Sequence, residues 1–212
     1  KQMRYTDVVF DVDGTLVDSE WAVLVSLQRT LEAIGRPVPP AEELTFVLGI
    51  TGQDALRQMG VEDIPGTFDL WVVKLRELSG EQKPFADIPA LLQSLKGQGV
   101  RLGVVTSRTR PEFEAAFAHY GLRNFFDETV CSEDTREHKP SGEPLQEYMR
   151  RTGARPEQVL YVGDSRYDSG CAQNAGADFA LALWGAKSGE EIPAAYRPRE
   201  PRELGDLLLG QE

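Results

Sequence analysis

The sequence predicts an α/β fold: a Rossmann-like parallel sheet with helices on both faces, plus a small all-helical segment inserted after the first strand. Three observations predict this class. Short apolar runs alternate with longer amphipathic runs, glycines stand where the amphipathic runs should end, and one early stretch contains only helical patterns. Strands that alternate with helices of this length form a parallel sheet covered on both faces.

Five apolar runs are the expected strands, at residues 8–10, 102–105, 129–131, 159–162 and 179–183. Helical patterns lie between or after them, at 87–98, 111–120, 143–153, 168–176 and 202–209. A glycine stands at the expected end of four of these patterns, at Gly99, Gly121, Gly153 and Gly176. Residues 1–16 and 85–212 are therefore expected to form one core domain.

Residues 17–84 interrupt this alternation, because they contain no strand-like run and only helical patterns. One helical face there carries Leu24, Leu27, Leu31 and Ile34. We expect residues 17–84 to form a helical cap domain placed directly after the first strand. We also expect cap and core to close on each other about hinges near 16–19 and 82–86.

Composition narrows the possible partners. The 212 residues carry a net charge of −11, which argues against a nucleic-acid polymer because such binding needs a basic surface. No apolar run approaches the length of a membrane span, and no apolar stretch follows the charged start of the chain, so we expect a cytoplasmic protein without a membrane partner. Cys131 and Cys171 are expected to be buried, reduced thiols.

The first chemical motif is the string from Asp11 to Thr15, directly after the first expected strand. The carboxylate of Asp11 can attack phosphorus and form an acyl phosphate, which divides one difficult displacement into two easier ones. The carboxylate of Asp13 can protonate the leaving oxygen and then activate water. The alternative for such a string is a solvated acidic turn.

Two further motifs contribute phosphate-binding groups. Thr106 and Ser107 follow the second expected strand, where a hydroxyl and free N–H groups can bind phosphate oxygens, although they could equally cap the next helix. Lys139, followed by Pro140, can place a compact positive charge against a phosphoryl oxygen. Taken alone, Lys139 could be a surface loop lysine.

The fourth motif brings two more carboxylates, Asp164 and Asp168, after the fourth expected strand. Together with Asp11 they form an oxygen site that suits Mg²⁺ better than a soft metal. Asp168 could also cap the following helix. All four motifs lie just past the end of a strand, and in a parallel α/β sheet this edge is where ligands bind.

These motifs resemble those of the haloacid dehalogenase superfamily, over nearly the whole chain. The resemblance is closest to the phosphoglycolate phosphatase-like branch, which has a helical cap inserted after the first motif. It implies a phosphoric monoester hydrolase in which Asp11 is the nucleophile and Asp13 the general acid and base. Thr106 and Lys139 would then bind the transferring phosphoryl group.

The resemblance also implies a Mg²⁺ cofactor. The ion would be held by the carboxylates of Asp11 and Asp164 and the backbone carbonyl of Asp13, with Asp168 close by. The expected partner is a small phosphorylated substrate, such as phosphoglycolate, a sugar phosphate or a nucleotide, bound by a monomer or a homodimer. The expected substrate-binding residues are Gly14, Thr15, Ser107, Gln53 and Arg57. Arg57 could meet a second anionic group of the substrate, although a surface arginine on a helix is the commoner explanation.

Two other functions are compatible with these motifs. A phosphomutase of the β-phosphoglucomutase type would use the same core but hold a bisphosphate intermediate and exclude water. A non-hydrolytic signalling or binding module could accept phosphate on an aspartate, as receiver domains do. Receiver domains, however, do not place the nucleophile directly after the first strand, nor insert a helical cap there.

Overall fold

The structure, a computed structural model, describes residues 3–187 and 191–210. Its centre is a five-stranded parallel sheet in the order β5-β4-β1-β6-β7. The strands are β1 (Asp7–Phe10), β4 (Arg101–Val105), β5 (Glu128–Val130), β6 (Val159–Gly163) and β7 (Asp178–Leu181). All five predicted strands are present, so the predicted fold class is confirmed. The prediction differs most at β7, which ends two residues earlier than expected.

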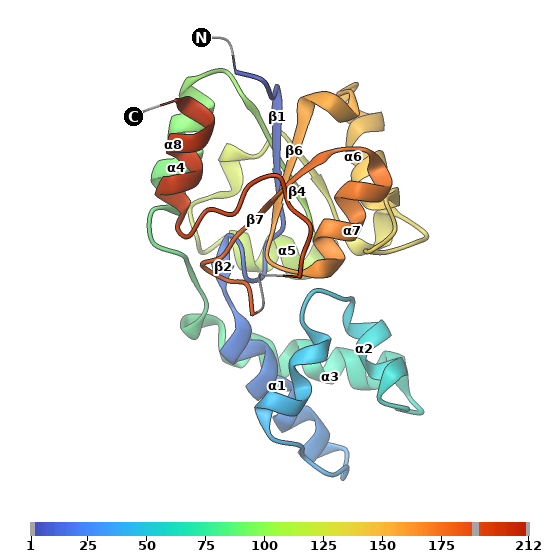
Figure 1. Ribbon diagram of the computed structural model, residues 1–212. Helices are drawn as coiled ribbons and strands as arrows, with labels where there is room; N and C mark the ends of the chain where they lie inside the picture. The colour runs from blue at the N-terminus through green and yellow to red at the C-terminus, as the bar shows by residue number, and fades with distance from the viewer. Residues whose placement is uncertain (1–2, 188–190, 211–212) are drawn as a thin grey trace.

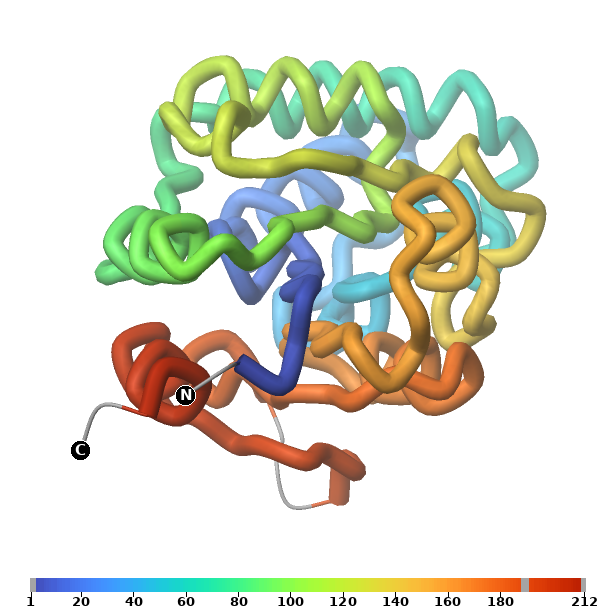
Figure 2. Tube along the Cα trace, turned by 90° about the horizontal axis from the view of Figure 1, so that it is seen from above, coloured from blue at the N-terminus to red at the C-terminus, as the bar shows by residue number. Residues whose placement is uncertain are grey.

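Helices cover both faces of this sheet (Figure 2). They are α4 (Ile88–Gly97), α5 (Arg110–Phe117), α6 (Glu143–Thr152), α7 (Arg166–Ala175) and α8 (Pro201–Leu209). Seen from above, green α4 and red α8 lie together on one side, and orange α6 and α7 lie on the other. Single turns of 3₁₀ helix connect some of them, at η3 (Arg123–Phe125), η4 (Ser132–Asp134) and η5 (Pro156–Gln158).

The hydrophobic core has two halves because successive strand residues point to opposite faces. Val8 and Phe10 of β1 pack with helices α4, α5 and α8, whereas Val9 packs with α6 and α7. Each of these three side chains is fully buried. Helices α6 and α7 end at Gly153 and Gly176, whose φ angles of 73° and 76° are the left-handed conformation that ends a helix.

Residues 17–84, the predicted cap, contain a hydrophobic cluster of their own, which includes Leu27, Leu31, Leu56 and Trp71. Its helices are α1 (Glu20–Ala33), α2 (Gly52–Gln58) and α3 (Ile64–Glu77), with 3₁₀ helices η1 (Ala41–Val47) and η2 (Ser79–Glu81). Figure 1 shows α1, α2 and α3 beyond the lower end of the sheet, which is the C-terminal end of β1.

The prediction that residues 17–84 contain no strand is wrong at both ends of the segment. β2 (Val17–Asp18) and β3 (Lys83–Pro84) pair antiparallel where the chain leaves the core and returns to it. Strands of two residues are too short to give an alternating pattern, so sequence reading cannot find them. The two predicted hinge regions contain these strands.

Two further expectations concern the chain as a whole. Cys131 and Cys171 are both buried and free, as predicted. Within the described residues, none of the helices combines the length and the apolar character that crossing a membrane requires.

Candidate active site

The four motifs meet at the C-terminal edge of the sheet. Asp11 follows β1, Thr106 follows β4 and Asp164 follows β6, while the loop between β5 and α6 brings Lys139 beside them. The cap lies over the same edge (Figure 1). Residues that are up to 153 positions apart in the sequence therefore share one site, as expected for the crevice of an open parallel sheet.

Lys139 lies between two buried carboxylates. Its Nζ is 3.1 Å from Oδ1 of Asp11 and 2.9 Å from Oδ1 of Asp168. Burial alone would lower the pKa of Lys139, but the two carboxylates outweigh it and hold the pKa above its ordinary value. The ammonium therefore stays charged, directly beside the oxygen atoms of Asp11.

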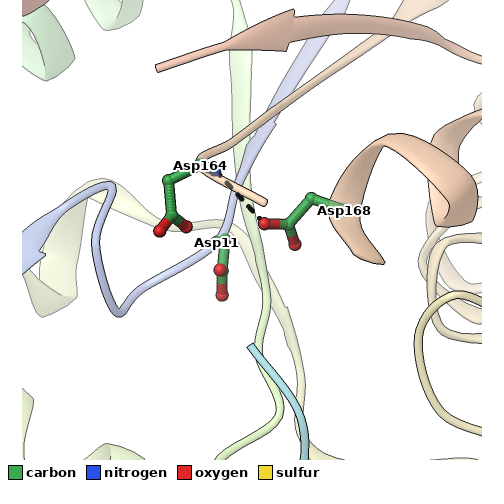
Figure 3. Close-up of side chains that lie close together, drawn as sticks. All are labelled: Asp11, Asp164 and Asp168. Carbon is green, nitrogen blue, oxygen red and sulfur yellow. Dashed lines mark hydrogen bonds between the residues drawn. The ribbon is translucent and has the colours of Figure 1, made fainter. Parts of the chain in front are cut away.

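Three carboxylates form a compact oxygen site (Figure 3). Asp11, Asp164 and Asp168 each place one carboxylate oxygen within 4.8 Å of the others. When all three are ionised, they carry two negative charges more than the single positive charge of Lys139 compensates. This donor set and this charge fit a divalent cation with oxygen ligands, which is the chemistry of Mg²⁺.

Burial and the proximity of these carboxylates to one another also raise the pKa values of Asp11 and Asp164. Burial and the nearby Asp168 carboxylate raise the pKa of Asp11 to about 8, although the ammonium of Lys139 acts in the opposite direction. Burial, Asp168 and Asp11 raise the pKa of Asp164 well above its ordinary range. A cation between these carboxylates would favour their ionised forms.

Asp168 is the third residue of α7 and is fully buried. Its Oδ1 accepts hydrogen bonds from Lys139 and from the hydroxyl of Tyr161, the latter at 2.9 Å. Its Oδ2 accepts from the hydroxyl of Ser165 at 2.9 Å and from the backbone N–H of Asp164 at 3.2 Å. Both oxygens are thus engaged with protein, so Asp168 orients Lys139 and the loop that carries Asp164.

Asp13 lies in a different environment from Asp11. Its Oδ2 accepts from Nε of Arg108 at 2.8 Å, and its Oδ1 accepts from Nη2 of Arg108 and from the Ser19 hydroxyl, both at 2.5 Å. Nη2 of Arg108 also donates to Oε1 of Gln82 at 2.9 Å. Burial would raise the pKa of Asp13, but Arg108 and Ser19 more than offset it, so the pKa is lowered.

Gly14 and Thr15 contact Asp164. The Thr15 hydroxyl donates to Oδ1 of Asp164 at 3.3 Å, and a Cβ atom at Gly14 would lie 2.2 Å from Oδ2 of the same carboxylate. The indole Nε1 of Trp184 donates to the carbonyl of Thr15 at 2.8 Å, and Gly185 comes so close to Gly14 that a Cβ there would meet its carbonyl. This turn fixes the position of Asp164.

Residues 8–182 match the family model of haloacid dehalogenase-like hydrolases. The chain belongs to this family. A phosphoglycolate phosphatase of Aquifex aeolicus is 31% identical over 205 residues, which cover 95% of this chain and 95% of that protein. The pyrophosphatase PpaX of Bacillus cereus is 28% identical over 92% of this chain and 91% of its own length. The crystal structure of a Lactobacillus plantarum protein has a TM-score of 0.88 at 27% identity, covering 97% of this chain and 100% of that one.

These matches confirm the predicted resemblance and identify the chain as a haloacid dehalogenase-like hydrolase. The two phosphate-binding candidates after β4 line a small pocket together with Lys139 in this hydrolase. Thr106 is buried and its hydroxyl accepts from the backbone N–H of Arg108 at 3.1 Å. The Ser107 hydroxyl donates to the carbonyl of Gly49 in the cap at 3.3 Å.

The structure does not bring Gln53 and Arg57 to the site of the hydrolase. The Arg57 side chain is 63% exposed and pairs with Asp54 at 2.6 Å, and neither Gln53 nor Arg57 lines the cavity beside Asp11. The reason is the orientation of α2, which buries Ala55 and Leu56 in the cap cluster. The role of Arg57 as a cap cation that faces the substrate stays a prediction, and this arrangement does not support it.

Sequence reasoning missed three residues of this site: Ser19, Gln82 and Arg108. Arg108 follows Thr106 and Ser107 directly, so its position just after a predicted strand could have identified it as a candidate site residue. Ser19 and Gln82 gave no signal, because they meet Asp13 and Arg108 only through the pairing of β2 with β3.

Proposed function

We propose that the chain is a Mg²⁺-dependent phosphatase that hydrolyses a small phosphorylated metabolite through an aspartyl-phosphate on Asp11. The observation that supports this most is the contrast between two neighbouring carboxylates. Asp11 shares a buried oxygen site with Asp164 and Asp168 and faces the Lys139 ammonium, whereas Asp13 is held by Arg108 and Ser19. Two acids held in different environments suit two different roles.

In the first step, a carboxylate oxygen of Asp11 attacks phosphorus and the bond from phosphorus to the leaving oxygen breaks. Lys139 offsets the repulsion between the anionic nucleophile and the phosphoryl oxygens, since its ammonium is 3.1 Å from Asp11. Asp13 donates a proton to the leaving oxygen, so the product leaves as an alcohol. Thr106 and Ser107 are the proposed donors to the phosphoryl oxygens.

In the second step, the ionised carboxylate of Asp13 takes a proton from water, and the water oxygen attacks phosphorus. The bond between phosphorus and Asp11 breaks, which releases inorganic phosphate and restores the Asp11 carboxylate. The pairing with Arg108 favours the ionised form of Asp13 that this step needs. The first step needs the protonated form, so the pairing has to loosen when substrate binds.

The proposed Mg²⁺ site consists of Asp11, Asp164 and the backbone carbonyl of Asp13, with Asp168 behind them. The two uncompensated negative charges of this cluster support a divalent cation. Bound there, Mg²⁺ supplies positive charge that stabilises the transferring phosphoryl group.

We propose that the cap closes on the core during this reaction and excludes water from the first step. Ser19 and Gln82 support this proposal, because each lies next to a strand of the β2–β3 pair and each contacts the Asp13–Arg108 pair. Movement of these segments would therefore change the contacts of Asp13, the proposed acid/base, and of Arg108.

The relatives support a phosphate compound as substrate, since one is a phosphoglycolate phosphatase and another a pyrophosphatase. The test is phosphate release from a panel of phosphoglycolate, pyrophosphate, sugar phosphates and alkyl phosphates, with Mg²⁺ or with a chelator. We expect release that requires Mg²⁺ and is lost in Asp11→Asn, while a surface control such as Asp87→Asn retains it. Isomerised sugar phosphate without free phosphate would identify a mutase, and no turnover by folded protein with Mg²⁺ would reject the hydrolase.

A further inference from the structure

The cavity beside the nucleophile lies between the core and the cap. Asp11 and Asp13 form its core side, and helix α3 and the loop before α2 form its cap side. The cap rests on the core at this point, since Ser107 donates to the carbonyl of Gly49 at 3.3 Å and Nδ1 of His138 is 3.6 Å from Asp54. The residues that line this cavity are thus the ones that a substrate's leaving group would meet.

The cap side of the cavity is apolar. It includes Leu48, Ile50, Phe68, Trp71, Val72 and Leu75. The indole Nε1 of Trp71 donates to the Ser26 hydroxyl at 3.0 Å inside the cap. Trp71 therefore offers no free hydrogen-bond donor to the cavity. Phe68, Val72 and Leu75 are only half-buried, so their apolar surface remains available to a ligand.

The cation that lines the cavity is already paired with a carboxylate. Arg108 is the one cation among the described residues that line it, and Arg108 is paired with Asp13 through two hydrogen bonds. The lining also includes the carboxylate of Glu112, which accepts from the backbone N–H and hydroxyl of Thr109. A second anionic group on the substrate would therefore meet Asp13 and Glu112 without a free cation.

We infer that the leaving group is uncharged and apolar next to the ester bond, so that the substrate class is the phosphate monoester of an aliphatic or aromatic alcohol. Phosphoglycolate and pyrophosphate are poor matches, because each carries a second anion close to the scissile bond. Val72 and Leu75 also line a neighbouring pocket between α3 and α5, whose lining includes Arg76 and His119 farther from Asp11. This inference rests on the proposed phosphatase function and specifies its substrate.

A second cavity, on the side of Asp164, is the rival position for a leaving group. It is lined by Arg166 and Lys187 as well as by several acids. Lys187 pairs with Glu20, and Asp11 is not part of this lining. A substrate with a second anionic group would have to bind Arg166 in this cavity. Loss of activity in Arg166→Ala would therefore indicate that the leaving group lies here and not in the cavity beside Asp11.

The first experiment measures kcat/KM for phosphate release by the full chain with Mg²⁺, comparing phosphoglycolate with isobutyl phosphate. These two esters match in size, and the isopropyl group of one replaces the carboxylate of the other. We expect the uncharged ester to be preferred by at least about tenfold. Across ethyl, propyl and butyl phosphate we expect kcat/KM to rise by about fourfold for each methylene that enters the apolar cavity.

The second experiment places a cation in the cavity. Val72→Arg should shift the ratio of kcat/KM for phosphoglycolate over isobutyl phosphate on the order of tenfold towards phosphoglycolate. Val73→Arg is the matched control, because Val73 is the next residue of α3, is 49% exposed and does not line the cavity. A thermal melt verifies that both variants are folded. If either variant is unfolded, the alkyl series measured on the unchanged chain tests the inference instead.

Preference for phosphoglycolate or pyrophosphate, a flat alkyl series, or loss of the preferred activity in Arg166→Ala would overturn the inference while leaving the phosphatase function intact. An equal shift in Val72→Arg and Val73→Arg would also overturn it. Absence of Mg²⁺-dependent release from every ester would instead reject the proposed function, and the inference with it.

Discussion

The guanidinium group of Arg108 binds both carboxylate oxygens of Asp13, at 2.5 and 2.8 Å, and the Arg108 side chain is 8% exposed. A bidentate pair of this kind fixes the orientation of the carboxylate as well as its charge. Because Arg108 also contacts Gln82, and Ser19 also contacts Asp13, the proposed acid/base is joined to both connections between core and cap.

Replacement of Arg108 should therefore impair the chemistry more than substrate binding. We expect Arg108→Ala to lower kcat on the order of 10²-fold for an alkyl phosphate, the lower end of what a positioned acid contributes. The loss in the first step, measured as p-nitrophenol released in the first turnover, should be much smaller with p-nitrophenyl phosphate, whose leaving group needs no proton. Arg108→Lys should recover part of the loss, since it retains the charge without the bidentate geometry. Equal losses in the first turnover of both substrates would show that Arg108 does not act through protonation of the leaving group.

The raised pKa of about 8 for Asp11 predicts how the metal-free protein responds to pH. An unfolded aspartate has a pKa of about 3.9, so the folded state binds more protons than the unfolded state between these values. The free energy of unfolding should then fall as pH rises, by up to about 1.4 kcal/mol per pH unit in chelator between pH 6 and 8. Urea unfolding at these two pH values measures this, and saturating Mg²⁺ should remove most of the difference.

Asp164→Asn should separate the two effects of the acidic cluster. Removing one carboxylate relieves repulsion among Asp11, Asp164 and Asp168, so the variant should melt higher than the unchanged chain in chelator. It should also lose the stabilisation that Mg²⁺ gives, because one proposed ligand is gone. Thermal melts with and without Mg²⁺ measure both. A variant that Mg²⁺ stabilises as strongly as the unchanged chain would contradict the proposed site.

Tyr148→Phe should lower stability without affecting catalysis. The Tyr148 hydroxyl donates to Oδ1 of the fully buried Asp7 at 2.8 Å, at the start of β1 and thus away from the active-site edge. Losing a hydrogen bond to a buried carboxylate costs about 1.5–3 kcal/mol. Urea denaturation measures the loss, and kcat at 25 °C should stay unchanged. A large fall in kcat would show that the two ends of β1 are coupled.

The sequence was sufficient to predict the sheet and the motif loops, for a physical reason. Val8 to Phe10 and Val159 to Val162 are buried on both faces, so they form continuous apolar runs, and the polar residues that follow mark the strand ends. The juxtaposition of Asp11 with Lys139 follows from the parallel order of the strands, because all strands end at one edge.

The cap and the Asp13 environment could not be predicted in the same way. Val72 and Phe68 have the spacing of ordinary helix core positions, so nothing in the sequence distinguishes a cavity wall from a packed interior. The pairing of Arg108 with Asp13 joins residues 95 positions apart, and its geometry depends on side-chain orientation, which the order of elements does not determine. The exposed position of Arg57 could not be predicted either, because a helical pattern does not show which way its polar face turns.

The central claim, a covalent phosphoryl group on Asp11, is tested most directly by trapping it. Asp13→Asn lacks the base that activates water, but p-nitrophenyl phosphate can still phosphorylate Asp11 because its leaving group needs no acid. Incubation with Mg²⁺ and mass spectrometry should show one added phosphoryl group on the peptide that contains Asp11, labile to hydroxylamine and absent from the double variant with Asp11→Asn. Substrate consumption without a phosphoryl group on Asp11, or with the group on another residue, would contradict the mechanism.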